Sequence, residues 1–95
     1  MLPSHRIPTH PGEVLLEEFL KPLEITQKEL AKHIRVPIQR VNEIVRGRRG
    51  VSPSTAWLLA DALGTSPEFW TNLQAQYDLA VNRPKRSVKR LRRTG

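Results

Sequence analysis

The sequence predicts an all-α protein, a compact bundle of five short helices. In five successive segments apolar side chains recur three and four positions apart, which is the spacing of a helix with one buried face. Prolines, glycines and Ser-Pro pairs separate these segments, and such residues start or stop helices. No stretch alternates apolar and polar residues over a useful length, so the pattern does not favour strands.

The first helix is expected to begin at Pro11 and to end near Lys21. Proline is favoured at the first helical position, where the amide has no partner within the helix, and Pro22 cannot continue the helix. Residues 1–10 have no periodic apolar pattern, and we expect them to form a flexible arm. The apolar stripe consists of Leu15, Leu16, Phe19 and Leu20.

Residues 26–46 predict two helices joined by a tight turn. Thr26 and Glu29 have the spacing of a capping box, which starts the first of these helices. Pro37 pushes Val36 out of the helical region, so the first helix ends there and a second begins. The apolar positions of the second helix are Ile38, Val41, Ile44 and Val45. Such a pair forms a helix-turn-helix, whose second helix lies in the major groove of DNA.

Two similar start signals, Ser52-Pro53 and Ser66-Pro67, predict the last two helices. Serine caps a helix N-terminus and proline suits the position after it. Gly64 is expected to end the fourth helix, and Pro84 to end the fifth near residue 82. The fifth helix has apolar residues on more than one face, so one face can pack on the bundle while another is left for a partner.

The net charge of +7 is concentrated at one end of the chain. Residues 83–95 hold seven basic residues and no acidic one, so residues 1–82 balance at zero. We expect this basic tail to be disordered and the domain to span residues 11–82. Within the balanced part, residues 26–49 hold seven basic and two acidic residues, a net of +5. Positive charge therefore lies on the motif that would face phosphate.

Composition argues against several other classes of protein. The chain has no cysteine, and its histidines do not have the spacing of a zinc site, so we expect neither a metal nor another cofactor. The three, His5, His10 and His33, are interpreted as ordinary polar residues. The serines are explained by helix starts, so no enzyme is predicted. No apolar run reaches membrane length and no signal peptide is evident, so we expect a cytoplasmic protein without membrane contact.

Particular residues of the motif resemble a known family. Gln27, Leu30-Ala31, Val36, Val41 and Ile44 lie where the Xre, Cro and phage-repressor helix-turn-helix has them. The run RVNEIVRGRRGVSPSTAWLLADALGTSPEFWTNLQAQYDL resembles the HigA antitoxins of toxin–antitoxin modules, and the likeness covers Pro11 to Leu79. It implies a repressor of its own operon that also neutralises a HigB-like toxin, a small basic ribonuclease that cuts mRNA.

One residue departs from the family pattern. The turn of the motif usually has glycine where this chain has Arg35. Arginine in a left-handed conformation costs on the order of 1 kcal/mol relative to glycine. We therefore expect the turn to be slightly re-formed.

Two groups of residues are predicted to contact a palindromic operator. Glutamine pairs with adenine and arginine with guanine, so Gln39 and Arg40 are expected to read base edges, although Arg40 could instead touch only phosphate. The base-contacting group, partly placed by alignment with the phage repressors, is Ile38, Gln39, Arg40 and Glu43. The phosphate-contacting group is Gln27, Lys28, Arg46, Arg48 and Arg49, with a merely solvated loop as the alternative for Arg48 and Arg49.

A twofold dimer is expected, because one small helix-turn-helix makes too few base contacts for tight operator binding. Its candidate interface residues are Leu58, Trp70, Leu73, Tyr77 and Val81. The candidate toxin contacts are the acids of the first helix, Glu13, Glu17 and Glu18, whose sign suits a basic partner. The alternatives are that these acids form a plain solvated face, or that the tail binds the toxin despite its unfavourable sign.

Two other functions remain open from the sequence. One is a stand-alone Xre-like transcriptional regulator without a toxin partner. The other is a general RNA- or nucleoid-binding protein driven by the basic tail, with the helix-turn-helix as a scaffold.

Overall fold

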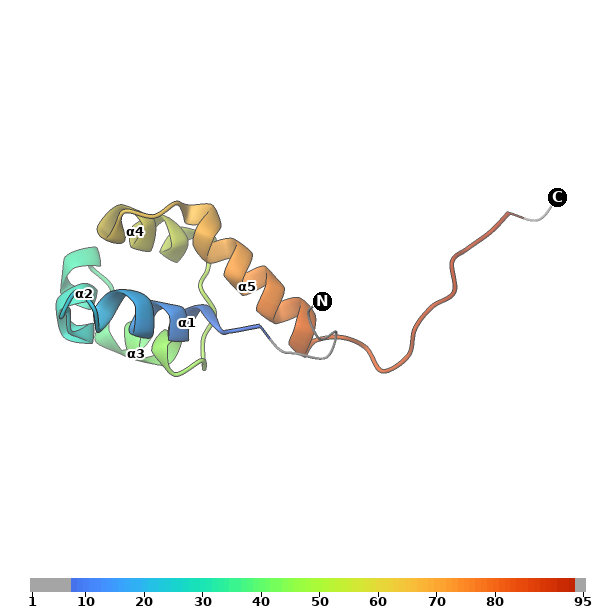
Figure 1. The fold of residues 1–95 in the computed structure, drawn as a ribbon, viewed down its shortest axis with the longest axis horizontal. Coiled ribbons are helices and arrows are strands. Elements are labelled where there is room, and N and C mark those ends of the chain that lie inside the picture. Colours follow the sequence, from blue (N-terminus) through green and yellow to red (C-terminus); the bar gives the residue numbers. More distant parts are fainter. Residues whose placement is uncertain (1–7, 94–95) are drawn as a thin grey trace.

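The structure, a computed structural model, describes residues 8–93 and is all-helical, with no strand among those residues (Figure 1). The elements are α1 (Pro11–Val14), η1 (Leu15–Leu20), α2 (Gln27–Ile34), α3 (Ile38–Val45), α4 (Pro53–Leu63) and α5 (Pro67–Val81). Because α1 runs directly into η1, they form one continuous helix. The predicted five-helix, all-α fold is confirmed. Most of the predicted arm, residues 1–7, and the last two residues of the tail, 94–95, lie outside the described residues.

The centre of the core is Trp70 of α5, whose side chain is 0% exposed. Its ring packs against Phe19 at 5.4 Å and Phe69 at 5.0 Å between ring centroids. The indole N–H donates a hydrogen bond of 2.7 Å to the Thr65 hydroxyl, so the polar atom of this large side chain is satisfied. The other helices contribute buried residues, among them Leu15, Leu30, Val41 and Leu59. This core fixes the N-terminal half of α5 to the bundle.

The predicted helix starts are confirmed by their hydrogen bonds. The Thr26 hydroxyl accepts from the Glu29 amide and the Glu29 carboxylate accepts from the Thr26 amide, each at 3.0 Å. The bond from the Thr26 amide lowers the pKa of the Glu29 carboxyl. Ser52 accepts from the Thr55 amide at 3.3 Å, and the Ser66 hydroxyl accepts from the Phe69 amide at 3.1 Å. These caps satisfy amides that would otherwise lack a partner.

The first helix differs from a regular α-helix in its second half, where η1 is a π-helix. The Lys21 amide donates to the Leu16 carbonyl at 3.0 Å, a bond that spans five residues. The wider turn brings residues five positions apart to the same side. Leu15 and Leu20 are accordingly both buried in the core.

His10, which was predicted to lie in the N-terminal arm, is part of the folded domain. Its Nδ1 accepts a hydrogen bond of 2.9 Å from the Gly12 amide and so caps α1. Its ring meets Tyr77 of α5 edge-on, at 4.8 Å between ring centroids. The interpretation of His10 as an ordinary polar residue of a flexible arm was therefore wrong. Local sequence patterns missed this contact because its partner lies 67 positions away.

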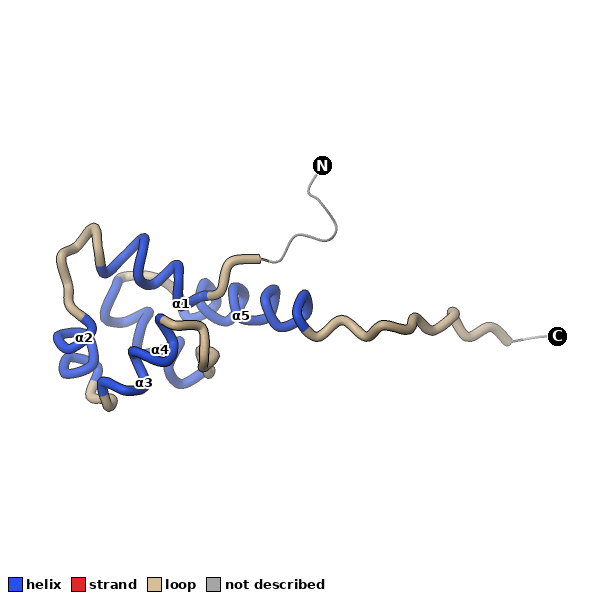
Figure 2. Tube along the Cα trace, turned by 90° about the horizontal axis from the view of Figure 1, so that it is seen from below, coloured by secondary structure: helices blue, strands red, loops and turns tan. Residues whose placement is uncertain are grey.

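The C-terminal tail leaves the bundle after α5 (Figure 1 and Figure 2). Residues 83–93 are exposed and contain no helix. Within residues 8–93, no helix is both long enough and apolar enough to cross a membrane.

Candidate nucleic-acid interface

The turn between α2 and α3 keeps a left-handed conformation, with Arg35 at φ 59° and ψ 48°. The Arg35 amide donates to the Lys32 carbonyl at 3.3 Å, and the Val36 amide donates to the Ala31 carbonyl at 3.0 Å. These bonds satisfy the last carbonyls of α2. The expectation of a re-formed turn was therefore wrong, because arginine itself takes the position that usually belongs to glycine. The strain remains local, at about 1 kcal/mol.

Helix α3 buries one face and exposes the other. Val41 and Ile44 lie in the core, while Ile38 is 44% exposed and Gln39 is also exposed. The exposed face borders a shallow groove of about 380 Å³, lined by Gln27, Ile38, Gln39, Asn42, Glu43 and Arg48. Three of the four predicted base-contacting residues thus share one surface. The fourth, Arg40, is half-buried and lies outside this groove.

A hydrogen bond joins the start of α2 to the middle of α3. The Asn42 amide group donates to Gln27 Oε1 at 3.2 Å. This bond uses the oxygen of the Gln27 amide and leaves its NH2 donors out, and Gln27 itself lines the groove. Lys28, the next residue, is exposed beside it. Asn42 thus holds the Gln27 side chain, a contact that was not predicted from the sequence.

The loop after α3 folds back over the end of that helix. The amides of Arg48 and Arg49 both donate to the Glu43 carbonyl, at 2.8 Å and 3.2 Å. Gly47 takes a left-handed conformation with φ 73°, which lets the chain reverse. The predicted phosphate contacts Arg46, Arg48 and Arg49 are all exposed here, and Arg48 also lines the groove.

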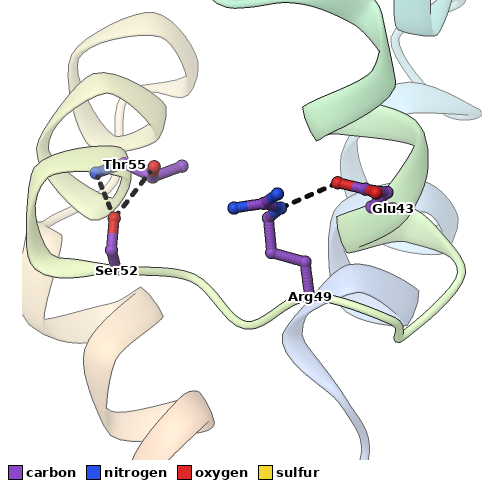
Figure 3. Close-up of polar contacts among 4 residues, drawn as sticks. All are labelled: Glu43, Arg49, Ser52 and Thr55. Atoms are coloured by element: carbon purple, nitrogen blue, oxygen red, sulfur yellow. Dashed lines mark hydrogen bonds and ion pairs between the residues drawn. The ribbon is translucent and has the colours of Figure 1, made fainter.

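Within this loop Arg49 forms an ion pair with a predicted base contact. Arg49 Nε lies 2.8 Å from Glu43 Oε1 (Figure 3). Both side chains are about half exposed, so the pair adds little to stability. Its electrostatic effect matters more, since an unpaired Glu43 carboxylate would repel phosphate. The pair neutralises that charge.

The far end of the loop is anchored to α4 and α5. Figure 3 shows the Ser52 hydroxyl bonded to Thr55 at the start of α4. The Val51 amide donates to Gln74 Oε1 at 2.7 Å, and a Cβ on Gly50 would lie 2.9 Å from the Gln74 side chain. Gln74 was not predicted to have a role, because nothing local in the sequence links it to a loop 23 residues away.

Helix α1 packs directly against the end of α3. A Cβ on Gly12 would lie 1.7 Å from the Ile44 carbonyl oxygen, so only glycine permits this approach. A glycine in the first turn of a helix is unfavourable by itself, and that was the one signal in the sequence for a close contact. The N-terminus of α1 is therefore in close contact with the end of α3.

The structure corrects one predicted dimer contact. Trp70 cannot touch a second subunit, because packing inside its own subunit encloses it completely. Leu58, Leu73 and Tyr77 are half-buried, and Val81 is exposed. The most exposed apolar residue of α5 is Leu79, at 76%, and it was not predicted.

The predicted toxin contacts all lie on the surface of the first helix. Glu13, Glu17 and Glu18 are exposed. Glu17 forms an ion pair of 2.8 Å with Lys21, so the acidic surface is partly neutralised. The predicted acidic surface therefore carries Lys21 beside Glu17 at the end of the same helix.

The chain resembles several known proteins over most of its length. The helix-turn-helix family profile matches residues 16–70. Antitoxin HigA-1 of Vibrio cholerae is 42% identical over 79 residues, which are 83% of this chain and 74% of that protein. The chain belongs to the HigA-type helix-turn-helix family. The predicted resemblance is thereby confirmed, and this family consists of DNA-binding proteins rather than enzymes.

Several of the similar solved structures contain DNA. The Pseudomonas aeruginosa antitoxin HigA with the higBA promoter has a TM-score of 0.76 and 44% identity, covering 78% of this chain and 80% of that one. Antitoxin GraA in complex with its operator has a TM-score of 0.84 and 39% identity, covering 98% and 100%. Other relatives are named only as regulators, such as the uncharacterized HTH-type transcriptional regulator YbaQ of Escherichia coli, at 38% identity over 83% of this chain and 70% of that protein.

Proposed function

We propose that this protein is a cytoplasmic antitoxin that represses its own operon and neutralises a basic, mRNA-cleaving toxin. The observation that carries the DNA-binding part is the exposed face of α3 beside the groove, bordered by the basic loop 47–50. The operator and promoter complexes of GraA and HigA support the same part.

In this proposal α3 lies in the major groove, where base pairs present distinct patterns of donors and acceptors. Gln39 pairs with adenine and Arg40 with guanine, while Ile38 and Glu43 lie close to the base edges. Arg49 shields the Glu43 carboxylate from the phosphates. The surrounding backbone contacts are made by Gln27, Lys28, Arg46, Arg48 and Arg49, which position the helix without reading sequence.

The proposed functional unit is a twofold dimer on an inverted-repeat operator. Its interface lies on the C-terminal half of α5, where Leu73, Tyr77 and Val81 are joined by the exposed Leu79, with Leu58 of α4 at its edge. Two recognition helices then meet half-sites about 10 bp apart, or a multiple of that distance.

The proposed toxin site is the first helix, since Glu13, Glu17 and Glu18 offer a basic protein an acidic surface. Complementary charge of this kind speeds encounter more than it deepens affinity. Co-expression with the product of the neighbouring gene tests this part. We expect co-purification and restored growth, and slower association after Glu13→Lys with Glu18→Lys. Loss of neutralisation on deletion of residues 83–95, with no effect of the charge reversals, would move the site to the tail.

The base-reading part is tested by measuring affinity for operator and random DNA. Gln39→Ala and Arg40→Ala should each cost about 1–3 kcal/mol at the operator and much less on random DNA. Equal losses on both duplexes would contradict base readout. For Arg40 they would favour a phosphate contact instead.

The alternative function is a stand-alone regulator without a toxin, which the relatives named only as regulators favour. This alternative differs from the proposed antitoxin function in one expected observation. The operator would still be bound with the same specificity, but no basic protein encoded beside the gene would co-purify or require this chain for growth of the cell.

A further inference from the structure

The basic tail, residues 83–95, is the strongest concentration of charge in the molecule. It carries seven of the sixteen basic residues, while residues 1–82 have no net charge. In the described part of the chain both ion pairs, Glu17 with Lys21 and Glu43 with Arg49, lie in the bundle and not in the tail. The positive charge of residues 83–93 is therefore exposed to whatever anion the protein meets.

The start of the tail is fixed in space by the cap of α5. The Asn82 amide and its side-chain NH2 both donate to the Asp78 carbonyl, at 3.1 Å and 2.8 Å. The last turns of α5 lie beside the start of α1, because Tyr77 packs on His10. The chain leaves its bundle from a defined position.

That position lies at the end of the bundle where the recognition helix finishes. Gly12, two residues after His10, packs against the Ile44 carbonyl near the end of α3. Gln74, on the same stretch of α5, holds the Val51 amide after the basic loop. Helix α5, from whose end the tail leaves, is thus joined to the basic loop through Gln74 and to α3 through His10 and Gly12.

We propose that the tail is a second DNA-binding element, an arm that follows the phosphate backbone next to the half-site held by α3. This inference rests on the operator binding proposed above. An extended chain of 13 residues reaches about 40 Å, which is longer than one helical turn of DNA at about 34 Å. Duplex DNA carries one charge per roughly 1.7 Å of its axis, so the arm meets phosphates along its whole length.

Duplex DNA explains the composition of the tail better than other partners. A basic toxin would be repelled, and a membrane would require an apolar face, whereas Val88 and Leu91 are the only large apolar residues of the segment. The acidic first helix of the same chain, with Glu13 and Glu18, competes with DNA for the tail. RNA offers the same charge, but the tail is attached to a domain whose recognition helix suits a duplex.

Such an arm reads no sequence. It raises affinity for operator and random DNA by the same factor, and it makes binding strongly dependent on salt, because each neutralised phosphate releases counterions. Specificity remains with α3. The arm therefore speeds the search for the operator without choosing it.

The test compares the full-length protein with a charge variant of the same length. The variant carries seven substitutions: Arg83→Gln, Lys85→Gln, Arg86→Gln, Lys89→Gln, Arg90→Gln, Arg92→Gln and Arg93→Gln. A matched control, Val88→Ser with Leu91→Ser, keeps every charge. Binding to an operator duplex, a random duplex and a single-stranded RNA is measured over a series of salt concentrations.

We expect the charge variant to lower the salt slope by about three units or more per chain on both duplexes, at about 0.9 unit per phosphate, while the control matches the original protein. The ratio of operator to random affinity should stay constant. An unchanged slope overturns the inference, as does tighter duplex binding by the variant, which would show the tail to be an internal shield for the acidic helix. A larger loss on RNA than on duplex DNA overturns it in favour of RNA. If the original protein itself does not prefer its operator, the proposed function fails instead.

Discussion

Replacing Gly12 by alanine tests the contact between α1 and the recognition helix. The added Cβ would lie 1.7 Å from the Ile44 oxygen, whereas real contacts of this kind are not shorter than 3.0 Å, so the two helices must separate by at least 1.3 Å. Overpacking costs about 1–3 kcal/mol, and we expect the upper end because a backbone carbonyl cannot rotate away as a side chain can. Better helix propensity returns less than about 1 kcal/mol.

The net loss of about 2 kcal/mol corresponds to a fall in Tm of roughly 8–16 °C for a domain of this size. The matched control is Gly64→Ala, where a Cβ meets nothing within 4 Å but the backbone has φ 73°. It should lose only about 1 kcal/mol, from left-handed strain. Thermal unfolding followed by circular dichroism measures both variants.

The same pair of variants separates stability from function. At a temperature where both proteins are folded, Gly12→Ala should weaken operator binding because the end of α3 is displaced, and Gly64→Ala should not. If Gly12→Ala unfolds no earlier than Gly64→Ala, or if both bind the operator equally well, then α1 does not determine the position of α3.

Three further predictions use other contacts. Glu43→Gln removes the partner of Arg49 and should raise the salt slope on random DNA by about one unit with little change in Tm, while an unchanged slope would mean that Arg49 stays away from phosphate. Trp70→Ala should lower the free energy of unfolding, measured with urea, by about 3–5 kcal/mol. Leu79→Ser should leave that free energy unchanged but weaken dimerisation, measured by ultracentrifugation, and the reverse pattern would contradict the burial of Trp70. Burial lowers the pKa of His10 against the opposing effect of Asp78, so the unfolded chain takes up a proton at a higher pH than the folded protein. The free energy of unfolding should therefore fall as pH drops below about 6.5, and His10→Asn, which keeps a cap on α1, should flatten this part of the curve of stability against pH.

The sequence predicted the helices well because their boundaries depend on neighbouring residues. Thr26 and Glu29 form their capping box by themselves, and Ser66-Pro67 starts a helix whatever lies elsewhere in the chain. The burial of Trp70 was not predictable in the same way. Helical spacing showed that α5 has two apolar faces, but only the packed bundle decides which residue lies inside.

In the candidate site, too, local features were predictable from the sequence and contacts between distant residues were not. The exposure of Gln39 follows from the spacing of buried residues within α3, so it was predicted. The same spacing placed Ile38 among the apolar positions, whereas it is 44% exposed. The bonds from Asn42 to Gln27 and from Val51 to Gln74 join residues 15 and 23 positions apart, and no local pattern specifies them. Arg35 shows the opposite error. A local preference for glycine was taken as decisive, although the hydrogen bonds at the end of α2 hold the turn without it.

The bond between the Val51 amide and Gln74 has a consequence for operator length. Gln74 lies on α5, the helix proposed to join the two subunits, and it also holds the loop that carries Arg48 and Arg49. In that dimer, the two loops would therefore be held at a fixed distance from each other by the joined α5 helices and would not move independently. The dimer would bind only operators whose phosphates match the distance between the two loops. A substitution on α5 would therefore change the preferred spacing of the half-sites before it changes which bases are read.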